Sequence, residues 1–225
     1  MNENIHIETV KHDAWSIRYV IDQTEEICLE AVKQNGNALK YVKNQTDLIC
    51  TEAVKQDGWN LRYVKEQTEN VCIEAVKENG NALEFVKEQT DLICLEAVKE
   101  SGNALKYVKQ QTEEICLTAV KQHGWSLEYV QNQTEEICLE AVKQNGHSLE
   151  YVMVQTNRIC IESVRENVRA LRYIKNVPLR VCLTIILCIP LILSSSLFTK
   201  LSRYVNGRMR ALKLCKLFSF SLKRR

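Results

Sequence analysis

The sequence predicts an all-α protein, an open α-solenoid of eight tandem 22-residue helix–turn–helix units followed by an apolar and basic C-terminal segment. Three observations support this fold class. A threonine returns every 22 residues from Thr24 to Thr156, without a single insertion. A cysteine, a glycine and a leucine recur with the same step at fixed offsets. An aromatic residue also does so from Tyr19 to Tyr173. Several ladders in phase indicate units that pack on their neighbours.

Each repeat is expected to begin with a helix, as the stretch after Thr24 illustrates. Thr24 is a suitable N-cap, because its hydroxyl can accept a hydrogen bond from a free backbone N–H. Two glutamates follow in the first turn, where the helix dipole favours negative charge. The residues with apolar helical spacing are Ile27, Cys28, Ala31 and Val32.

A second short helix is expected after a turn at Asn35 and Gly36. We expect Gly36 to end the first helix in the left-handed conformation, which glycine adopts without steric cost. The second helix should turn Leu39 and Tyr41 inward and end near Gln45. A leucine-rich repeat can also have this period, but no segment alternates as its strand requires. Helices this short are marginal alone, so stacked units must cover each other's apolar faces and form a curved solenoid.

The charged residues divide the chain into parts. Residues 1–177 carry 20 basic and 28 acidic residues, a net −8, whereas residues 178–225 carry 10 basic and no acidic residues, a net +10. We therefore expect a repeat solenoid over 2–177, an apolar segment over 178–199 and a basic tail over 200–225.

The apolar segment allows two interpretations. Val181 to Thr199 contains no charged residue, and its 19 residues are near the lower limit for a membrane span. It is therefore either a membrane anchor or a degenerate ninth repeat, since Pro178, Cys182 and Leu193 stay in phase with the ladders. In the anchor interpretation, six basic residues would contact anionic lipid. These are Lys200, Arg203, Arg208, Arg210, Lys213 and Lys216. The tail could instead bind nucleic acid or act as a localisation signal.

One segment resembles a known family. The stretch Glu30–Val42, and again Glu140–Val152, is similar to a short helical repeat family of unknown function that is abundant in giant DNA viruses of protists. The resemblance covers residues 2–177. It implies a helical repeat fold, is consistent with a viral origin, and implies no activity.

The cysteine ladder is expected to be structural. No repeat holds two cysteines, as a zinc site commonly would. Equivalent positions in neighbouring helices lie about 9–10 Å apart, whereas a disulfide needs Cα atoms within about 7 Å. We expect buried, reduced thiols and therefore an intracellular, cytoplasmic body, with membrane association possible through residues 181–199.

Nothing in the sequence singles out catalytic chemistry. The four histidines, His6, His12, His123 and His147, form no metal-ligand pattern, and a catalytic set would need a nucleophile, a base and an orienting group in mutual reach. We expect no enzyme activity, no metal and no cofactor.

The candidate partner-binding residues form a column that breaks the regularity of the repeats. This variable column follows the inter-helix turn and reads Trp15, Asn37, Trp59, Asn81, Asn103, Trp125, His147 and Arg169. Tryptophan and arginine are typical of binding hot spots, although turns also vary freely. A second column holds basic residues in some repeats and acidic residues in others. Its charges could determine how a partner aligns along the repeats. This charge column reads Arg18, Lys40, Arg62, Glu84, Lys106, Glu128, Glu150 and Arg172.

These patterns favour a non-catalytic protein-binding scaffold or adaptor with an unidentified protein partner. The alternatives are an RNA-binding helical repeat protein and a membrane-tethered adaptor. Nucleic acid is disfavoured for the repeats by their negative charge, since phosphate contacts dominate such affinity. The lysines at the helix ends should pair with glutamates three residues earlier, as Lys33 would with Glu30.

Overall fold

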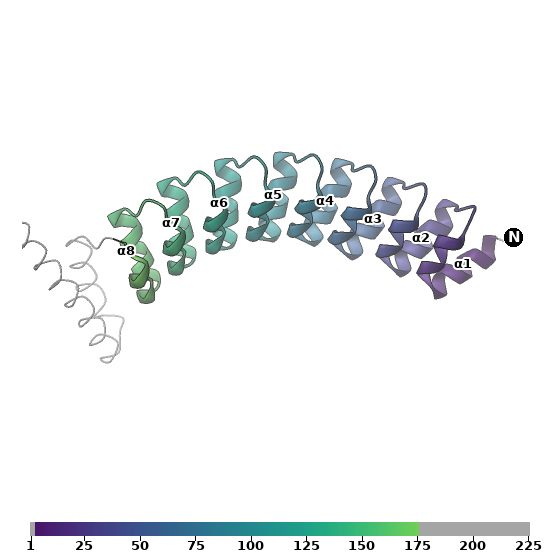
Figure 1. Ribbon diagram of the computed structural model, residues 1–225, viewed down its shortest axis with the longest axis horizontal. Coiled ribbons are helices and arrows are strands. Elements are labelled where there is room, and N and C mark those ends of the chain that lie inside the picture. Colours follow the sequence, from purple (N-terminus) through teal and green to yellow (C-terminus); the bar gives the residue numbers. More distant parts are fainter. Residues whose placement is uncertain (1–2, 176–225) are drawn as a thin grey trace, which may run out of the picture.

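The computed structural model describes residues 3–175, which form a row of eight helical hairpins (Figure 1). Each hairpin has a ten-residue α-helix followed by a six-residue 3-10 helix. The α-helices are α1 Glu3–His12, α2 Glu25–Gln34, α3 Asp47–Gln56, α4 Glu69–Glu78, α5 Asp91–Glu100, α6 Glu113–Gln122, α7 Glu135–Gln144 and α8 Asn157–Glu166. The 3-10 helices are η1 Ala14–Tyr19, η2 Gly36–Tyr41, η3 Gly58–Tyr63, η4 Gly80–Phe85, η5 Gly102–Tyr107, η6 Gly124–Tyr129, η7 Gly146–Tyr151 and η8 Val168–Tyr173. The predicted all-α repeat solenoid is therefore confirmed.

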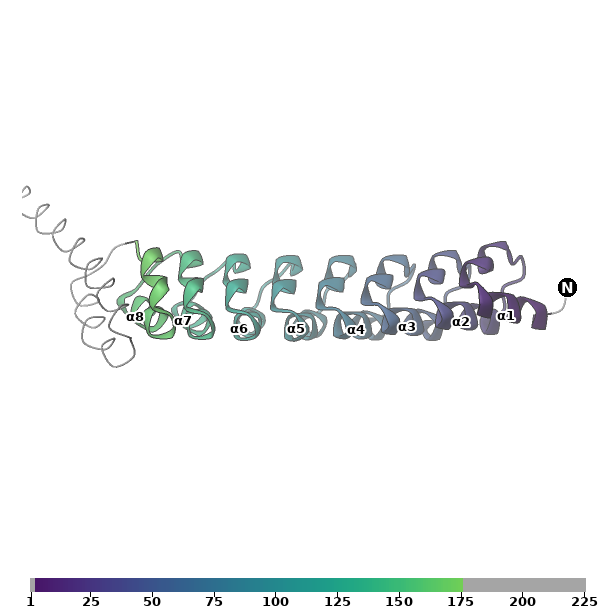
Figure 2. The same cartoon turned by 90° about the horizontal axis from the view of Figure 1, so that it is seen from below.

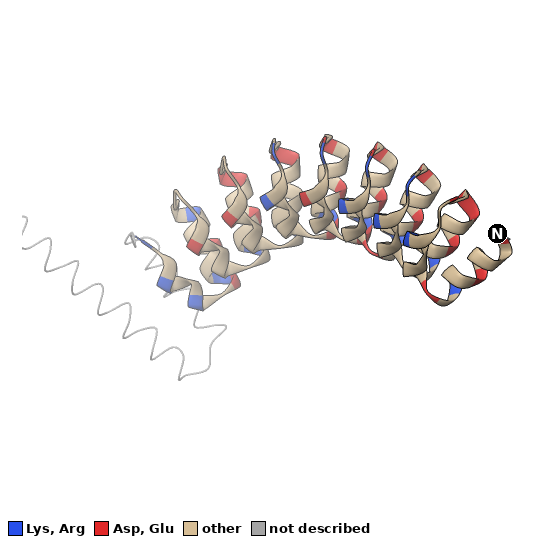
Figure 3. Cartoon of the chain, turned by 45° about the vertical axis from the view of Figure 1, so that its right-hand side comes forward, with Lys and Arg blue, Asp and Glu red and all other residues tan. Residues whose placement is uncertain are grey.

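The hairpins stack side by side along a gentle arc, with the α-helices in one layer and the 3-10 helices in another (Figures 1 and 2). Acidic residues of the first α-helical turns lie along the convex edge of the arc (Figure 3). The apolar segment 178–199 and the basic tail 200–225, with their candidate lipid-binding residues, lie outside the described residues. Within residues 3–175, none of the helices is both long and apolar enough to cross a bilayer.

The helices α2 to α8 each begin directly after a ladder threonine, as the sequence predicts. Thr46 Oγ1 accepts a hydrogen bond from the Ile49 N–H at 3.5 Å, which satisfies one of the free donors of the first turn. The same hydroxyl donates to Glu25 of the preceding repeat at 2.8 Å. The cap therefore also joins neighbouring repeats.

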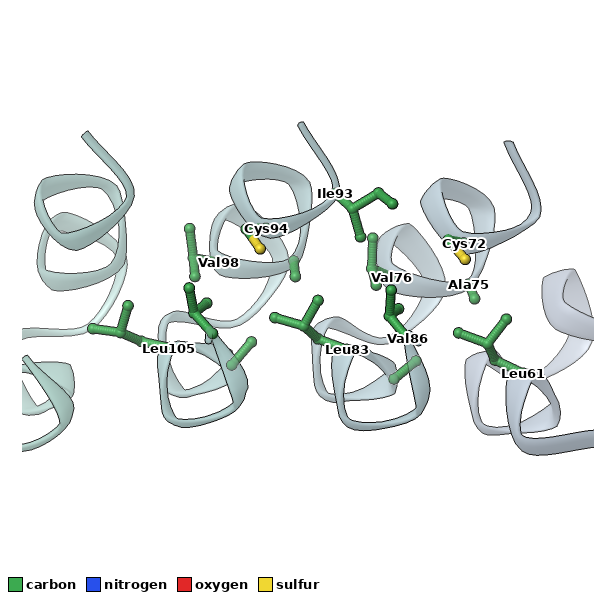
Figure 4. Packing of buried hydrophobic residues seen from close by; sticks show 14 of the residues in the cluster. Leu61, Cys72, Ala75, Val76, Leu83, Val86, Ile93, Cys94, Val98 and Leu105 are labelled. Atoms are coloured by element: carbon green, nitrogen blue, oxygen red, sulfur yellow. The ribbon is translucent and has the colours of Figure 1, made fainter. Parts of the chain in front are cut away.

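The core lies between the two layers and depends on stacking. Leu61, Leu83 and Leu105 of successive 3-10 helices point toward the layer that carries Cys72 and Cys94 (Figure 4). The end of the stack shows what a neighbour contributes. Ile5, in the first repeat, is 57% exposed, whereas its counterpart Ile27 is 1% exposed. Each repeat thus buries the apolar face of the next, as one short helix cannot do alone.

The prediction that Gly36 adopts a left-handed conformation is wrong. Every glycine of the described residues has a negative φ, and Asn35 before Gly36 is extended. The glycines are needed for a close approach between repeats instead. A Cβ on Gly58 would lie 2.3 Å from the carbonyl oxygen of Ala75 in the next repeat, and one on Gly80 would lie 2.3 Å from that of Ala97. Only a residue without a side chain lets the two backbones come this near.

The second helix is shorter than expected. It ends at Tyr41, where the Val42 N–H donates to the Leu39 carbonyl, and not near Gln45. Its start is capped by Asn35, whose side chain accepts from the Asn37 N–H at 3.0 Å. Gln45 therefore lies outside both helices and is free to make a different contact.

Candidate functional site

A glutamine at the end of each of the first seven repeats forms hydrogen bonds to the next repeat. Gln45 Nε2 donates to the Tyr63 carbonyl at 3.0 Å, and its Oε1 accepts from the Lys65 N–H at 2.9 Å. The glutamines that make these two bonds are Gln23, Gln45, Gln67, Gln89, Gln111, Gln133 and Gln155. Sequence reasoning missed this contact, although a glutamine before every ladder threonine was a signal for it.

Lysines in the connecting loops are also used for stacking. Lys65 Nζ donates to the Lys43 carbonyl at 2.7 Å, and Lys87 Nζ donates to the Lys65 carbonyl at 2.6 Å. In repeats 6 and 7 this position holds Gln131 and Met153. Met153 is 63% exposed. The ammonium groups of these loop lysines therefore bind backbone carbonyls of their own chain.

Most lysines at the ends of the α-helices form the expected ion pairs, but Lys55 lies 3.9 Å from Glu74 of the next repeat and does not pair with Glu52. Lys33 lies 2.9 Å from Glu30, and Lys99 lies 2.6 Å from Glu96. The pair is absent for Lys121 among the described residues, because Thr118 replaces the glutamate. This face is charge-balanced and solvated, and such exposed pairs contribute little to stability.

The seven cysteines of the ladder are free and buried. Burial raises the pKa of the Cys72 thiol to about 11, because the thiolate would lose its hydration. Glu69 raises the pKa further, and the cation of Lys87 lowers it. Such a thiol stays protonated at neutral pH and is a poor nucleophile. Within the described residues, no group of three or more His, Cys, Asp and Glu side chains is arranged to hold a metal ion.

Two shallow cavities lie at equivalent places between repeats. One, of about 360 Å³, is lined by Lys65, Gln67 and Cys72. The other, of about 270 Å³, is lined by Glu3 and His6, which occupy the positions of Glu69 and Cys72 in the first repeat. Because stacking residues line the first cavity, it belongs to the joints of the solenoid.

The variable column lies on the first turn of the 3-10 helices, and part of it is structural. The Trp15 ring meets that of Tyr41 edge-on at 5.8 Å, and the Trp59 ring meets that of Phe85 at 5.4 Å. His147 meets Tyr173 in the same way at 6.0 Å. These rings pack on the aromatic residue of the next repeat. Asn37, Asn81, Trp59 and His147 are half-buried, whereas Trp15, Asn103, Trp125 and Arg169 are exposed.

Variation in this column is coupled to the next residue. Wherever the column holds a ring, a polar residue follows, and wherever it holds asparagine or arginine, alanine follows. Asn60, which follows Trp59, is buried and donates to the Ala53 carbonyl at 2.9 Å. Part of the variation is therefore a choice between two ways of packing.

Trp125 is the exception in the column. Its ring is 45% exposed and meets His123 of its own repeat at 6.2 Å. No ring contact joins it to the next repeat among the described residues. Trp125 therefore exposes a large ring to solvent and lacks the ring contact with the next repeat that Trp59 makes.

The charge column lies beside a column of rings. All its residues are exposed. Arg62 lies over the Tyr63 ring at 4.8 Å, and Lys106 lies over the Tyr107 ring at 4.5 Å. The cations that lie over the ring next to them are Arg18, Lys40, Arg62, Lys106 and Arg172. Repeats 4, 6 and 7 have glutamate there instead.

Comparison with known proteins identifies the repeat. The sequence profile of a domain of unknown function, DUF4116, matches residues 2–45, 48–89, 92–133 and 113–155. A search of curated proteins found no match. A search of solved structures found none either. The tandem matches span well over half of the chain, so it belongs to the DUF4116 family.

Proposed function

We propose that this chain is a non-catalytic protein-binding scaffold whose docking surface is the 3-10 layer. The observation that carries the proposal is the state of Trp125, a tryptophan that is 45% exposed in an otherwise tightly stacked repeat. Exposed aromatic residues of this kind anchor protein interfaces, because they bury a large area at a low entropic cost.

The distribution of variation supports the same surface. The glutamines, threonines and inter-helix glycines that join the repeats stay nearly constant, whereas the variable column and the charge column differ from repeat to repeat. Both columns lie on the 3-10 helices. A solenoid with constant joints and a variable layer can present a distinct side chain at each step along its length.

RNA binding has less support. The loop lysines donate to backbone carbonyls, and the basic residues of the charge column lie over their own rings. With a net −8 over residues 1–177, few cations remain for phosphate. We propose a protein partner inside the cell, where the buried thiols would stay reduced.

The test is capture of a partner by the full-length tagged chain from nuclease-treated extract of its native cell. We expect a stoichiometric protein with the wild-type chain and at least about tenfold less with Trp125→Ala, as for a hot spot. Gln110→Ala is the matched control, because Gln110 is exposed and has no hydrogen bond among the described residues.

Three outcomes would contradict the proposal. One is recovery of no protein in excess over beads, and another is full capture by the Trp125→Ala variant. The third is capture that disappears with nuclease treatment and falls steeply with salt, which would favour RNA instead.

A further inference from the structure

The 3-10 layer contains a cation–π interaction that recurs from repeat to repeat. In five repeats, a cation from the charge column lies over the adjacent ring, at 4.5 to 5.8 Å from the ring centre. The face of an aromatic ring carries partial negative charge and attracts a cation within about 6 Å. Arginine and lysine both fill the position, so the site takes either kind of cation.

Repeats 6 and 7 keep the rings and lack the cations. Tyr129 and Tyr151 are half-buried, as are the other rings of the column except the exposed Tyr19, but the residues before them are Glu128 and Glu150. Neither carboxylate has an ion-pair partner among the described residues. Two consecutive repeats therefore offer a ring without its cation and a carboxylate without a counter-ion.

Glutamates of both repeats act on the same tyrosine. The pKa of Tyr151 is raised, first by partial burial and then by the charges of Glu128 and Glu150 together. Tyr129 contributes as well. Both carboxylates thus act on one phenol, and their like charges repel each other.

Repeat 4 differs, although it too has a glutamate. Glu84 acts on Lys106, whose pKa is raised by its hydrogen bond to Tyr107 and in small part by Glu84. Glu84 therefore acts on a cation of the next repeat, although it forms no ion pair among the described residues. Among the eight described repeats, only repeats 6 and 7 are neighbours that both have glutamate in place of the cation.

We infer that repeats 6 and 7 of the 3-10 layer bind a basic segment of the partner protein, with lysine or arginine side chains over Tyr129 and Tyr151 and paired with Glu128 and Glu150. The partner would supply the cations that five other repeats supply for themselves. Trp125 lies in the same 3-10 helix as Tyr129 and would pack against the apolar part of that segment. The inference rests on the proposed function and adds the chemistry of the partner.

The chain offers a matched substitution for the test. Glu128→Lys with Glu150→Lys gives repeats 6 and 7 the residue that repeats 2 and 5 already carry in Lys40 and Lys106, so the fold should be kept. The control is Glu114→Lys with Glu136→Lys, which makes the same change of charge in the same repeats on the first turns of α6 and α7.

The probe is a fluorescein-labelled octa-arginine peptide, titrated with the full-length chain at physiological salt and followed by anisotropy. We expect the Glu128→Lys and Glu150→Lys variant to weaken binding at least about tenfold, and the control variant by no more than about threefold. Equal weakening by both variants would overturn the inference, because the probe would then respond only to net charge.

A second pair of variants tests the rings. Tyr129→Phe with Tyr151→Phe keeps both aromatic faces, whereas Tyr129→Leu with Tyr151→Leu removes them. We expect the phenylalanine variant to bind within about twofold of the wild type and the leucine variant about tenfold more weakly. Equal affinities for the two variants would overturn the role of the rings. Circular dichroism checks that each variant is folded.

The two proposals fail in different ways. Loss of partner capture in Trp125→Ala, together with full capture by the Glu128→Lys and Glu150→Lys variant, would retain the scaffold and overturn this inference. Selective binding of octa-arginine without any captured partner would overturn the scaffold and retain a cation-binding surface.

Discussion

The side-chain amide of Gln111 lies 2.9 Å from the carbonyl oxygen of Tyr129, one repeat further along the chain. Its oxygen accepts from the Gln131 N–H at 3.0 Å. These two backbone groups lie at and just after the end of η6, where helical hydrogen bonding stops. One side chain thus satisfies a donor and an acceptor that neighbouring helices leave unpaired.

We predict that Gln111→Ala lowers the free energy of unfolding by about 2 kcal/mol, because a partly buried carbonyl and N–H lose their partner. The measurement is the urea midpoint of the full-length chain. Gln110 is the same residue type one position earlier, exposed and without a hydrogen bond among the described residues, and Gln110→Ala should cost less than about 0.5 kcal/mol. Equal losses in the two variants would mean that the contact adds nothing to stability.

Local features of the fold could be predicted from the sequence. The threonine cap at Thr46 and the ion pair of Lys33 with Glu30 depend on residues three or four positions apart in a helix. Such contacts follow from helical geometry alone. The period itself then predicts that the units stack.

Contacts between repeats could not be predicted in the same way. The left-handed conformation predicted for Gly36 would apply equally to its counterpart Gly58, because that is the usual reason for glycine after a helix. Its real constraint is the carbonyl of Ala75, 17 positions away. The role of Gln45 likewise depends on Tyr63 in the next repeat. Sequence patterns give the spacing of residues, but not which backbone atoms meet.

Tryptophans of the variable column that are alike in the sequence differ in the structure. The sequence predicted the variable column as a binding site with Trp59 and Trp125 as equals. In the structure Trp59 packs on Phe85, and Trp125 has no such contact among the described residues. Identical residue types at equivalent positions differ because their neighbours differ.

The close approach at Gly102 predicts whether a substitution by alanine raises or lowers stability. A Cβ on Gly102 would lie 2.5 Å from the Ala119 carbonyl oxygen, so Gly102→Ala should lower the free energy of unfolding by about 2 kcal/mol. Since Gly102 has a negative φ in a helix, alanine would otherwise stabilise the chain by about 1 kcal/mol. Urea unfolding decides the sign. Asn103→Ala, next to it and exposed, is the control and should change little.

The buried thiols predict slow chemistry in the folded chain. At pH 8, a colorimetric disulfide reagent should modify the seven ladder cysteines only as fast as the chain unfolds, because they are buried and protonated. In denaturant, all should react within the mixing time. Rapid reaction of Cys72 in the native chain, located by mass spectrometry, would contradict the burial.

The same thiols predict how stability depends on pH. The folded pKa of Cys50, Cys72 and Cys94 is about 11, above the 9.0 of a free thiol. A raised pKa means that folding favours the protonated form, so this contribution is complete below pH 9 and is lost as the pH rises toward 11. The urea midpoint should therefore fall from pH 9 to pH 10.5. The fall should be smaller when all three cysteines are alanine, and an unchanged fall would assign it to other groups.

Substitution of Trp59 should mainly lower stability, whereas substitution of Trp125 should mainly weaken binding of the partner. Trp59→Ala removes a half-buried ring that meets Phe85 edge-on at 5.4 Å, whereas Trp125→Ala removes a ring that is 45% exposed. We expect Trp59→Ala to cost about 2 kcal/mol more in the free energy of unfolding, because it leaves a gap between two repeats. Partner capture should show the opposite order when it is measured well below the urea midpoint. Equal costs in unfolding would mean that the ring contact of Trp59 has little value, and the two tryptophans would then be equivalent candidates for binding.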